Sequence, residues 1–419
     1  MNNVKAFLVV TIASALFVTK VNAQSNDDEP KKSLSFYGYV SYEAIFDSHE
    51  SVFTRDGDLY LYPAAPIYHV QSGELLNDNP QLEMLSLQSR LGVRIAGPDV
   101  LGAKLTGMVE TDFFATKEEF KHHLRIRHAL MKLQWEKASL TMGQFWHPMF
   151  TPEVFPHVIS FGAAAPFNPL NRSPQIRLDY TPSKSLKLVL AALAHGYHSS
   201  VGPEAAQRNS ALPDLQLQLH VGNSPTFNTG VTVGYMWLQP LLQVDNDDVY
   251  RSREFIGAYN LQWFGRLKLN KLAVQAKVSY GENMSQFVML GGYGRLLDDA
   301  AEMYDYGYAN ILSTASWVEV MYNFNDNWDF GFFGGMASAL GSKDKVDTQG
   351  PIWYNRGANI TNAYRWSPRL VYTQKSLRLA LEYLYNSANY GATLDEYAKP
   401  DDFTTTINHR VLVSAKYSF

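Results

Sequence analysis

The sequence predicts an all-β protein, a transmembrane antiparallel up-and-down β-barrel of about 16 strands with a constriction loop folded into its interior. Three observations predict this fold. Apolar residues recur with a period of two along most of the chain, which is the pattern of strands with one apolar face. Short and long connections alternate between the predicted strands. Aromatic residues are abundant, with 25 Tyr, 23 Phe and 8 Trp, and many fall near the predicted strand ends.

The period of two is clear in single segments. In DLQLQLHVG, Leu215, Leu217 and Leu219 share one face, while Gln216 and Gln218 share the other. The last nine residues, VLVSAKYSF, alternate in the same way and carry two aromatic residues at the end of their apolar face. Helical spacing of three and four is rare by comparison. These segments therefore read as strands that are apolar on one side only.

Over the whole chain, this pattern predicts sixteen strands. Their approximate ranges are 34–46, 86–97, 102–115, 123–136, 138–147, 174–181, 185–197, 213–223, 228–239, 252–264, 267–281, 312–325, 328–338, 361–373, 376–387 and 406–419. The long connections are 47–85, 116–122, 147–173, 198–212, 240–251, 282–311, 339–360 and 388–405. Strict alternation with short turns is typical of a barrel with one plain rim and one elaborated rim, and an even strand number places both chain ends at the plain rim.

The apolar faces indicate where such a sheet would be stable. A sheet in a bilayer must close, because each open edge leaves unpaired backbone groups in hydrocarbon. We therefore expect the last strand to pair with the first, with apolar faces toward lipid and polar faces toward the lumen. Tyr417 and Phe419 would then lie in the aromatic girdle of the periplasmic rim. A soluble β-sandwich also alternates, but it has no need of aromatic residues at its strand ends.

The first residues predict export. Lys5 precedes an apolar run from Ala6 to Val18, and Val-Asn-Ala precedes Gln24, as in a signal peptide with its cleavage site. The run is shorter than the roughly 20 residues that a spanning helix needs. We therefore expect a signal peptide at 1–23, a short polar segment at 24–33, and a barrel at 34–419 in the bacterial outer membrane.

Composition excludes several classes of function. The chain has no cysteine, which excludes disulfides, thiol catalysis and thiolate metal sites. Its net charge of −4, from 36 basic and 40 acidic residues, gives no indication of nucleic-acid binding. The histidines lack metal-ligand spacing, and no phosphate-binding glycine loop or nucleophile motif occurs. We therefore expect no cofactor, no metal and no enzymatic activity.

The loop at 147–173 is the first candidate for function. It follows the fifth predicted strand, is unusually apolar, and contains five prolines. A loop of this composition is not expected to extend into solvent. We interpret it as a constriction loop that folds into the lumen; the alternative is a packed Ω-loop on the surface.

Charged residues on the polar faces are the second candidate. Five arginines lie on the second, fourth and sixth predicted strands: Arg90, Arg94, Arg125, Arg127 and Arg177. Three acids lie on the third and sixth strands: Glu110, Asp112 and Asp179. An arginine ladder opposite an inserted loop would concentrate anions, and its planar forks fit carboxylates. Alternatively, the acids neutralise the arginines in a network that supports the wall. Both interpretations place all eight side chains in the lumen.

Three short pieces carry a family resemblance: Ser89-Arg90-Leu91-Gly92, Glu110-Thr111-Asp112-Phe113, and Leu124 to His128 with Gly143-Gln144 after it. Residues 86–181 resemble the general bacterial porin superfamily and, within it, the DcaP-like outer-membrane porins. The resemblance implies a sixteen-stranded homotrimer through which small anionic or carboxylated solutes diffuse. It also implies that the terminal Phe serves as a signal to the barrel assembly machinery. Some members carry an N-terminal coiled coil, for which residues 24–33 are too short and too polar.

The sequence leaves two other classes of function open. One is an outer-membrane barrel hydrolase with Ser, His and acidic groups at its rim, although no triad is recognisable from sequence. The other is an adhesin or structural barrel whose long loops bind a partner. The expected partners of the porin are outer-membrane lipid and lipopolysaccharide, small-molecule solutes, and further copies of the chain.

Overall fold

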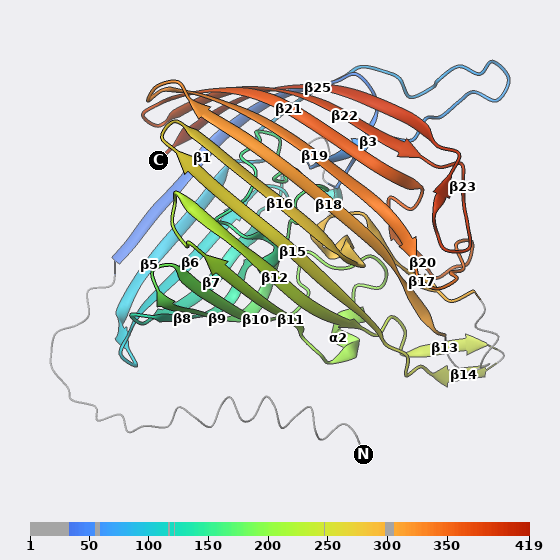
Figure 1. Cartoon of the computed structure of the whole chain (residues 1–419), viewed down its shortest axis with the longest axis horizontal. Coiled ribbons are helices and arrows are strands. Elements are labelled where there is room, and N and C mark those ends of the chain that lie inside the picture. Colours follow the sequence, from blue (N-terminus) through green and yellow to red (C-terminus); the bar gives the residue numbers. More distant parts are fainter. Residues whose placement is uncertain (1–32, 55–58, 116–117, 121, 247, 298–305) are drawn as a thin grey trace.

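The computed structural model describes residues 33–54, 59–115, 118–120, 122–246, 248–297 and 306–419. The predicted signal peptide at 1–23 and nearly all of the polar segment at 24–33 lie outside the described residues. Sixteen long strands form one closed antiparallel barrel in which each strand pairs with its neighbours along the chain (Figure 1). The predicted fold class is confirmed.

All sixteen predicted wall strands are present, with shifts of a few residues at their ends. They are β1 (Ser33–Asp47), β5 (Arg90–Val100), β6 (Ala103–Asp112), β7 (Arg125–Gln134), β8 (Ala138–Trp146), β9 (Arg172–Ser183), β10 (Leu186–Leu193), β11 (Asp214–Val221), β12 (Phe227–Leu238), β15 (Ile256–Leu269), β16 (Leu272–Glu282), β18 (Tyr308–Asn323), β19 (Trp328–Ser342), β21 (Ile360–Gln374), β22 (Leu377–Tyr390) and β25 (Thr404–Ser418).

Shorter elements lie in the long connections. The strands are β2 (Ser51–Phe53), β3 (Tyr60–Pro63), β4 (Gln81–Leu85), β13 (Gln243–Asn246), β14 (Asp248–Arg251), β17 (Gly291–Arg295), β20 (Trp353–Arg356), β23 (Thr393–Leu394) and β24 (Pro400–Asp401). The helical turns are η1 (Glu118–Phe120), η2 (Pro148–Phe150), η3 (Met284–Phe287) and α2 (Ala206–Ser210). None of the helices in the described ranges is long and apolar enough to cross a membrane.

The barrel closes between its first and last strands, as predicted. β1 and β25 pair from Tyr39 with Ser418 to Asp47 with Arg410. Beyond this ladder, the Gly38 amide donates to the Phe419 carbonyl at 3.2 Å, and the Phe419 amide donates to the Gly38 carbonyl at 3.1 Å. The final residue thus takes part in the seam, which leaves no open sheet edge there.

The outer surface of the barrel is apolar. Along β9, Ile176 and Leu178 are 60% and 42% exposed, whereas Gln175 and Arg177 between and beside them are 5% and 4% exposed. A soluble protein would show the reverse, because exposing large apolar side chains to water is unfavourable. The pattern recurs around the wall and fits a barrel whose outer face contacts lipid hydrocarbon.

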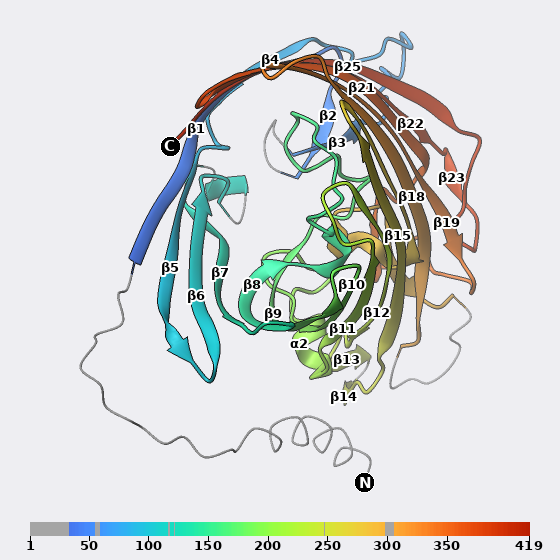
Figure 2. The same ribbon diagram turned by 60° about the vertical axis from the view of Figure 1, so that its left-hand side comes forward.

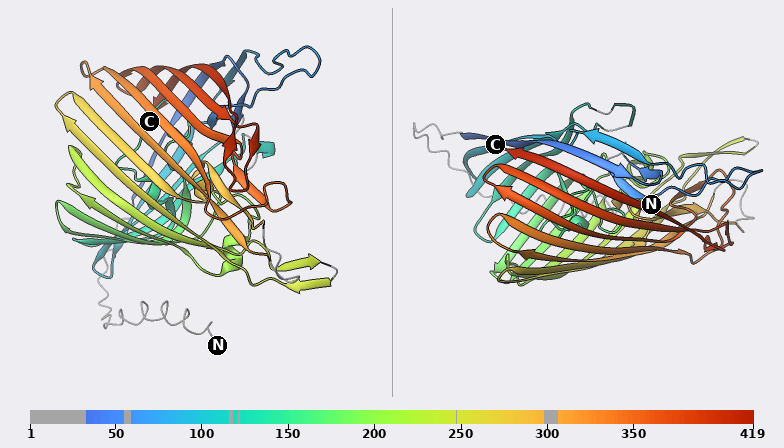
Figure 3. Two further views of the ribbon diagram at one scale, coloured as in Figure 1. Left: turned by 45° about the vertical axis from the view of Figure 1, so that its right-hand side comes forward. Right: turned by 90° about the horizontal axis from the view of Figure 1, so that it is seen from above.

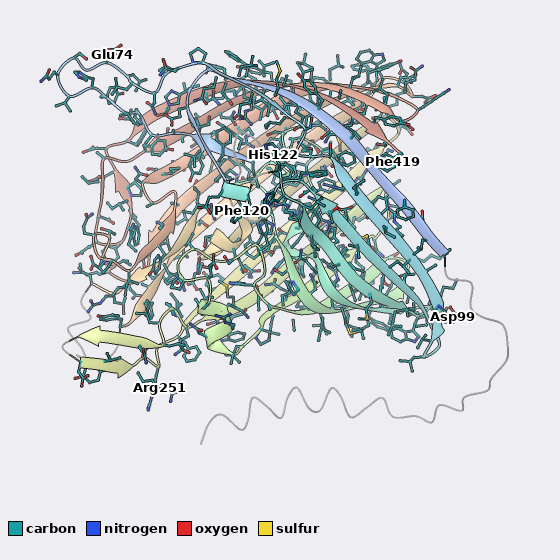
Figure 4. The ribbon with its side chains drawn as sticks, turned by 180° about the vertical axis from the view of Figure 1, so that it is seen from behind. Glu74, Asp99, Phe120, His122, Arg251 and Phe419 are labelled. Atoms are coloured by element: carbon teal, nitrogen blue, oxygen red, sulfur yellow. The ribbon has the colours of Figure 1, made fainter. Side chains whose placement is uncertain are left out.

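The two ends of the barrel differ in the way that the connection lengths predict. Phe419 and Asp99 lie at one end, which we call the short-turn end, and Glu74 and Arg251 lie at the opposite, long-loop end (Figure 4). The β13–β14 hairpin projects from the long-loop end, as Figure 3 shows. The strands are strongly tilted when the barrel is seen from above (Figure 3).

The second predicted strand, 86–97, differs from the observed wall. Both β4 and β5 pair with β1, so residues 86–89 interrupt what is otherwise one course of the wall. Gln88 lies in this interruption and points inward, where its Nε2 donates to both carboxylate oxygens of Glu43 at 2.5 and 2.6 Å. It has the same parity as Arg90 and Arg94, so alternation assigns its face correctly, but alternation does not show that the ladder with β1 is broken here.

Three long connections fold into the barrel and form a hydrophobic core there. The core contains Tyr62 from β3, Phe167 from the loop after β8 and Phe287 from η3, packed on Trp317 and Phe333 of the wall. Figure 2 shows the segments after β8 and around β2–β3 running inside the ring of strands. Part of the inner wall is therefore apolar, which the simple rule of polar lumen faces did not predict.

We predict that removing Tyr417 to Phe419 reduces the amount of folded barrel on the order of tenfold, because the closing ladder loses its last pairs in a medium that cannot solvate them. The fraction of protein that migrates as the SDS-resistant, heat-modifiable form measures this. Phe419→Trp is the control, since it keeps the backbone and the aromatic side chain. A truncated chain that folds as well as this control would contradict the prediction.

Candidate functional site

The loop after β8, residues 147–171, crosses the interior of the barrel. Its first turn is held by side chains of three wall strands. Gln218 on β11 donates to the Pro148 carbonyl at 2.8 Å, and Gln262 on β15 donates to the Thr151 hydroxyl at 2.9 Å. Lys277 on β16 donates to the Phe150 carbonyl at 2.7 Å.

Two buried carboxylates hold the middle of this loop against the far wall. Glu319 on β18 accepts the His157 amide at 3.0 Å and pairs with Arg369 at 2.6 Å. Glu382 on β22 accepts the amides of Ile159 and Ser160 at 3.0 and 2.8 Å. Each acid therefore satisfies backbone donors of a segment that has no sheet partner of its own.

The rest of the loop contacts the end of β6 and the wall strand β18. Phe161 stacks on Phe114 with ring centroids 4.0 Å apart, and Trp317 donates its indole N–H to Asn168 at 3.1 Å. The predicted in-folded loop is thus confirmed as a structural feature. It ends at residue 171 rather than 173, because β9 already begins at Arg172.

All eight residues predicted to line the lumen lie on inward-facing positions, and most of their charges are paired. Arg125 binds both oxygens of Asp112 at 2.7 and 3.0 Å. Arg127 bridges Glu110 at 2.8 Å and Asp112 at 2.9 Å. These four side chains form one buried network, which corresponds to the wall-supporting interpretation that the sequence left open.

The remaining four predicted residues differ from one another in their contacts. Arg177 pairs with Asp179 on its own strand at 2.9 Å. Arg90 lies 3.6 Å from Glu110 and also faces a cavity. The guanidinium of Arg94 lies 4.0 Å from the centre of the Tyr37 ring. The predicted ladder is therefore not a row of five equivalent free charges.

A cavity of about 610 Å³ lies between the in-folded loop and the wall, and we call it the cationic chamber. Its charged lining residues are Arg90, Arg127, Arg172, Arg378 and Lys416. No carboxylate belongs to its lining within the described ranges. Glu110 lies behind this lining and pairs with Arg127 and Arg90, so the cations without a described acid partner, Arg172 and Arg378, contribute most to the positive potential of the chamber.

Arg172, Arg378 and Lys416 are the three cations of the chamber that the sequence did not single out. Neither guanidinium has a described carboxylate within ion-pairing distance, and Arg172 lies 4.8 Å from the centre of the Trp146 ring. Arg172 has the sequence parity of the outward residues Ile176 and Leu178, so alternation could not assign it to the lumen. Arg378 follows a tight turn and carries no motif.

A second cavity, of about 660 Å³, lies toward the short-turn end and meets the chamber at Pro152, which lines both. Its basic lining residues are Arg94, Lys132, Lys137, Arg177 and Lys187, and its acidic ones are Glu136, Glu153 and Asp179. Basic residues therefore outnumber acidic ones along this part of the lumen as well.

The Glu153 carboxylate ties the in-folded loop to β10 through an ion pair with Lys187. Burial alone raises the pKa of Glu153, but the Lys187 ammonium, with smaller contributions from His220 and Arg177, outweighs it and lowers the pKa to about 2. The carboxylate therefore stays charged throughout the ordinary pH range.

A closed sixteen-stranded antiparallel barrel with an apolar outer belt, an in-folded loop after its fifth strand and a charged lumen has the fold of the bacterial porins. No protein-family model matches the chain, and neither does any curated protein sequence.

Solved structures do match. The outer membrane channel DcaP of Acinetobacter baumannii is 17% identical, with a TM-score of 0.66 over 93% of this chain and 97% of that one. The in-vitro folded OmpT, an outer membrane protein of Vibrio cholerae, is 12% identical, with a TM-score of 0.55 over 93% and 98%. An anion-selective porin from Comamonas acidovorans is 10% identical, with a TM-score of 0.54 over 93% and 100%. At these identities the matches establish the fold.

We predict that Glu382→Ala loosens the in-folded loop, because the buried amides of Ile159 and Ser160 lose their acceptor at roughly 1–3 kcal/mol for each unpaired group. Proteolysis within 150–165 should become faster, and the heat-modification midpoint should fall. Glu382→Gln is the matched control, since its side-chain carbonyl can still accept both amides. Equal behaviour of the two variants would show that the amide bonds do not hold the loop.

We also predict a pH-dependent contribution from Glu153. Because its folded-state pKa is lowered from 4.5 to about 2, the ion pair contributes stability above pH 4.5, and this contribution is lost as the pH falls from 4.5 toward 2. The difference in heat-modification midpoint between wild type and Glu153→Gln should be constant from pH 7 to about 5 and shrink below that range. A difference that is unchanged at pH 3 and below would contradict this assignment.

Proposed function

We propose that the protein is an outer-membrane porin that lets small hydrophilic solutes diffuse through its lumen, with a preference for anions. The observation that carries the proposal is the lining of the cationic chamber, which has five cations and no described carboxylate. The net charge of −4 would by itself predict the opposite preference. In a narrow pore, however, the nearest fixed charges dominate, because salt screens those beyond about 10 Å at 0.1 M.

The distribution of paired and unpaired cations supports this preference. Acids beside Arg125, Arg127 and Arg177 neutralise these side chains, so they contribute mainly to the wall. Arg172 and Arg378 have no such partner within the described ranges, and they face the chamber. An anion in the chamber therefore meets guanidinium groups whose donors are not already used by carboxylates.

Small carboxylates are the solutes that fit best. A guanidinium can donate two parallel hydrogen bonds to the two oxygens of a carboxylate, and Arg presents this fork more rigidly than Lys. The names of two structural neighbours, an outer membrane channel and an anion-selective porin, agree with the proposed class of solute.

The same proposal covers the loop, the location and the assembly of the protein. The loop at 147–171 narrows the lumen, since it crosses from β8 to the walls at Glu319 and Glu382.

Residues 1–23 act as a cleaved signal peptide, and the barrel then inserts into the outer membrane, where it contacts lipid and lipopolysaccharide. A homotrimer is the expected assembly, and one solved structure with this fold is described as a trimer form.

The pair formed by His147, at the start of the in-folded loop, and Asp214 does not support the hydrolase alternative. His147 Nε2 lies 3.2 Å from Asp214, which resembles the orienting half of a triad. Its Nδ1 accepts the Met149 amide at 3.2 Å, so this nitrogen is not available to take a proton from a nucleophile. An adhesin or structural barrel would not account for the unpaired cations in the lumen.

We predict that changing Arg172 and Arg378 together to Gln lowers the ratio of anion to cation permeability by roughly twofold or more, because two charges without a described acid partner leave the cationic chamber. The zero-current potential of single channels in a tenfold salt gradient measures this ratio. Lys343→Gln is the control for loss of a positive charge outside the chamber, since this side chain is 61% exposed and pairs with Glu282. A control that shifts the potential as much as the double variant would overturn the proposed role of the chamber.

A further inference from the structure

A separate polar cavity of about 320 Å³ lies beyond the in-folded loop, among the long connections. Four of them contribute to it: the β2–β3 connection, the segment after β10, η3 with the residue after it, and β20. Thr54, Tyr197, Ser199, Ser285 and Arg356 are among its lining residues. Its lining shares no residue with that of the cationic chamber.

Arg356 gives this cavity its charge. No carboxylate is among the described lining residues, and no described carboxylate lies within ion-pairing distance of the guanidinium. The Nε atom of Arg356 is buried and has no hydrogen-bond partner among the described residues. A buried donor in this state is unfavourable unless a ligand or water satisfies it, and an anion would satisfy both the donor and the charge.

The backbone holds Arg356 in place. β20 pairs with β17, and Tyr354 lies opposite Tyr293 in this ladder. Gly357 follows with a φ of 65°, which glycine adopts without strain, and a Cβ atom there would meet the Leu290 side chain at 2.6 Å. The position of the guanidinium is thus set by a strand and a tight turn rather than by a free loop.

The other polar side chains of the lining differ from Arg356, because some of them already bond within the protein. Ser285 already donates its hydroxyl proton to Asn283 at 2.7 Å, and Gln286 already uses one of its two amide hydrogens on Asp214 at 3.1 Å. Ser199 is a further hydroxyl-bearing residue of the lining. Tyr197, a lining residue, also lies with its ring 5.0 Å from the guanidinium of Arg125 in the lumen wall. The cavity therefore adjoins the wall that leads toward the chamber.

We propose that Arg356, assisted by Ser199, forms a second anion site, which takes a small oxyanion such as a carboxylate or sulfate at the long-loop end before it reaches the cationic chamber. The cavity has about half the volume of the chamber, which suits a single small oxyanion. The planar guanidinium can bind either a carboxylate or a tetrahedral oxyanion through two donors.

Crystals soaked in selenate, an anomalous scatterer of the same shape as sulfate, test the site directly. We expect an anomalous peak beside the Arg356 guanidinium in wild type and none in Arg356→Gln. Arg208→Gln, which removes an exposed arginine of α2 at the same end, should keep the peak. A wild type without the peak, or a peak that persists in Arg356→Gln, would overturn the proposal.

A second measurement tests whether solutes use the site on their way in. In oriented single channels carrying chloride current, sulfate added at the long-loop side should inhibit, and its half-inhibiting concentration should rise about threefold or more in Arg356→Gln. Sulfate from the short-turn side should act equally on both proteins, and Arg208→Gln should behave as wild type. Equal inhibition of wild type and Arg356→Gln from the long-loop side would reject the site as an entry point.

The two experiments also separate this inference from the proposed function. Selenate binding at Arg356 does not require the pore to prefer anions. A peak in a protein without anion preference would therefore overturn the proposed selectivity and leave the Arg356 site standing.

Discussion

The in-folded loop remains inside the barrel because the wall supplies partners for its backbone. A segment without a sheet neighbour must find an acceptor for each buried N–H and a donor for each buried carbonyl. Here Glu319 and Glu382 accept amides, while Gln218 and Lys277 donate to carbonyls. The position of the loop, and with it the shape of the lumen, depends on these polar wall residues more than on its own sequence.

Once the loop is fixed, charge and packing divide the lumen into two regions. On one side, side chains from three connections form a hydrophobic core against Trp317 and Phe333. On the other side, the cationic chamber remains open between the loop and the strands that carry Arg90, Arg127 and Arg172. The core supports the loop from behind, so the cations face a gap of defined size.

Much of this arrangement could be predicted from sequence. Alternation located all sixteen wall strands, and the inward parity of Arg125, Glu110 and Asp112 was correct, because a two-residue period fixes which face each side chain occupies. Connection lengths and apolarity also identified the in-folded loop.

The pairing of charges could not be predicted in the same way. Alternation along the strands predicts that Arg125 faces the lumen and that Arg172 faces outward, yet both face the lumen in the structure. Asp112 neutralises Arg125, whereas no described acid pairs with Arg172. Which acid reaches which arginine depends on strand register and side-chain length. The break in the β1 ladder at 86–89 and the cavity at Arg356 arise from irregular backbone, which has no periodicity to detect.

The contacts between the loop and the far wall also constrain the order of folding. The amide of Ile159 bonds to Glu382, 223 residues further along the chain, and the β3 carbonyl of Leu61 bonds to Arg365, 304 residues further. Contacts this distant form only after most of the intervening chain has been arranged, because long closures carry the greatest entropic cost. The wall strands β21 and β22 must therefore be in place before the interior can be packed. A barrel captured during assembly would have a wide, water-filled lumen that narrows only when the last strands arrive.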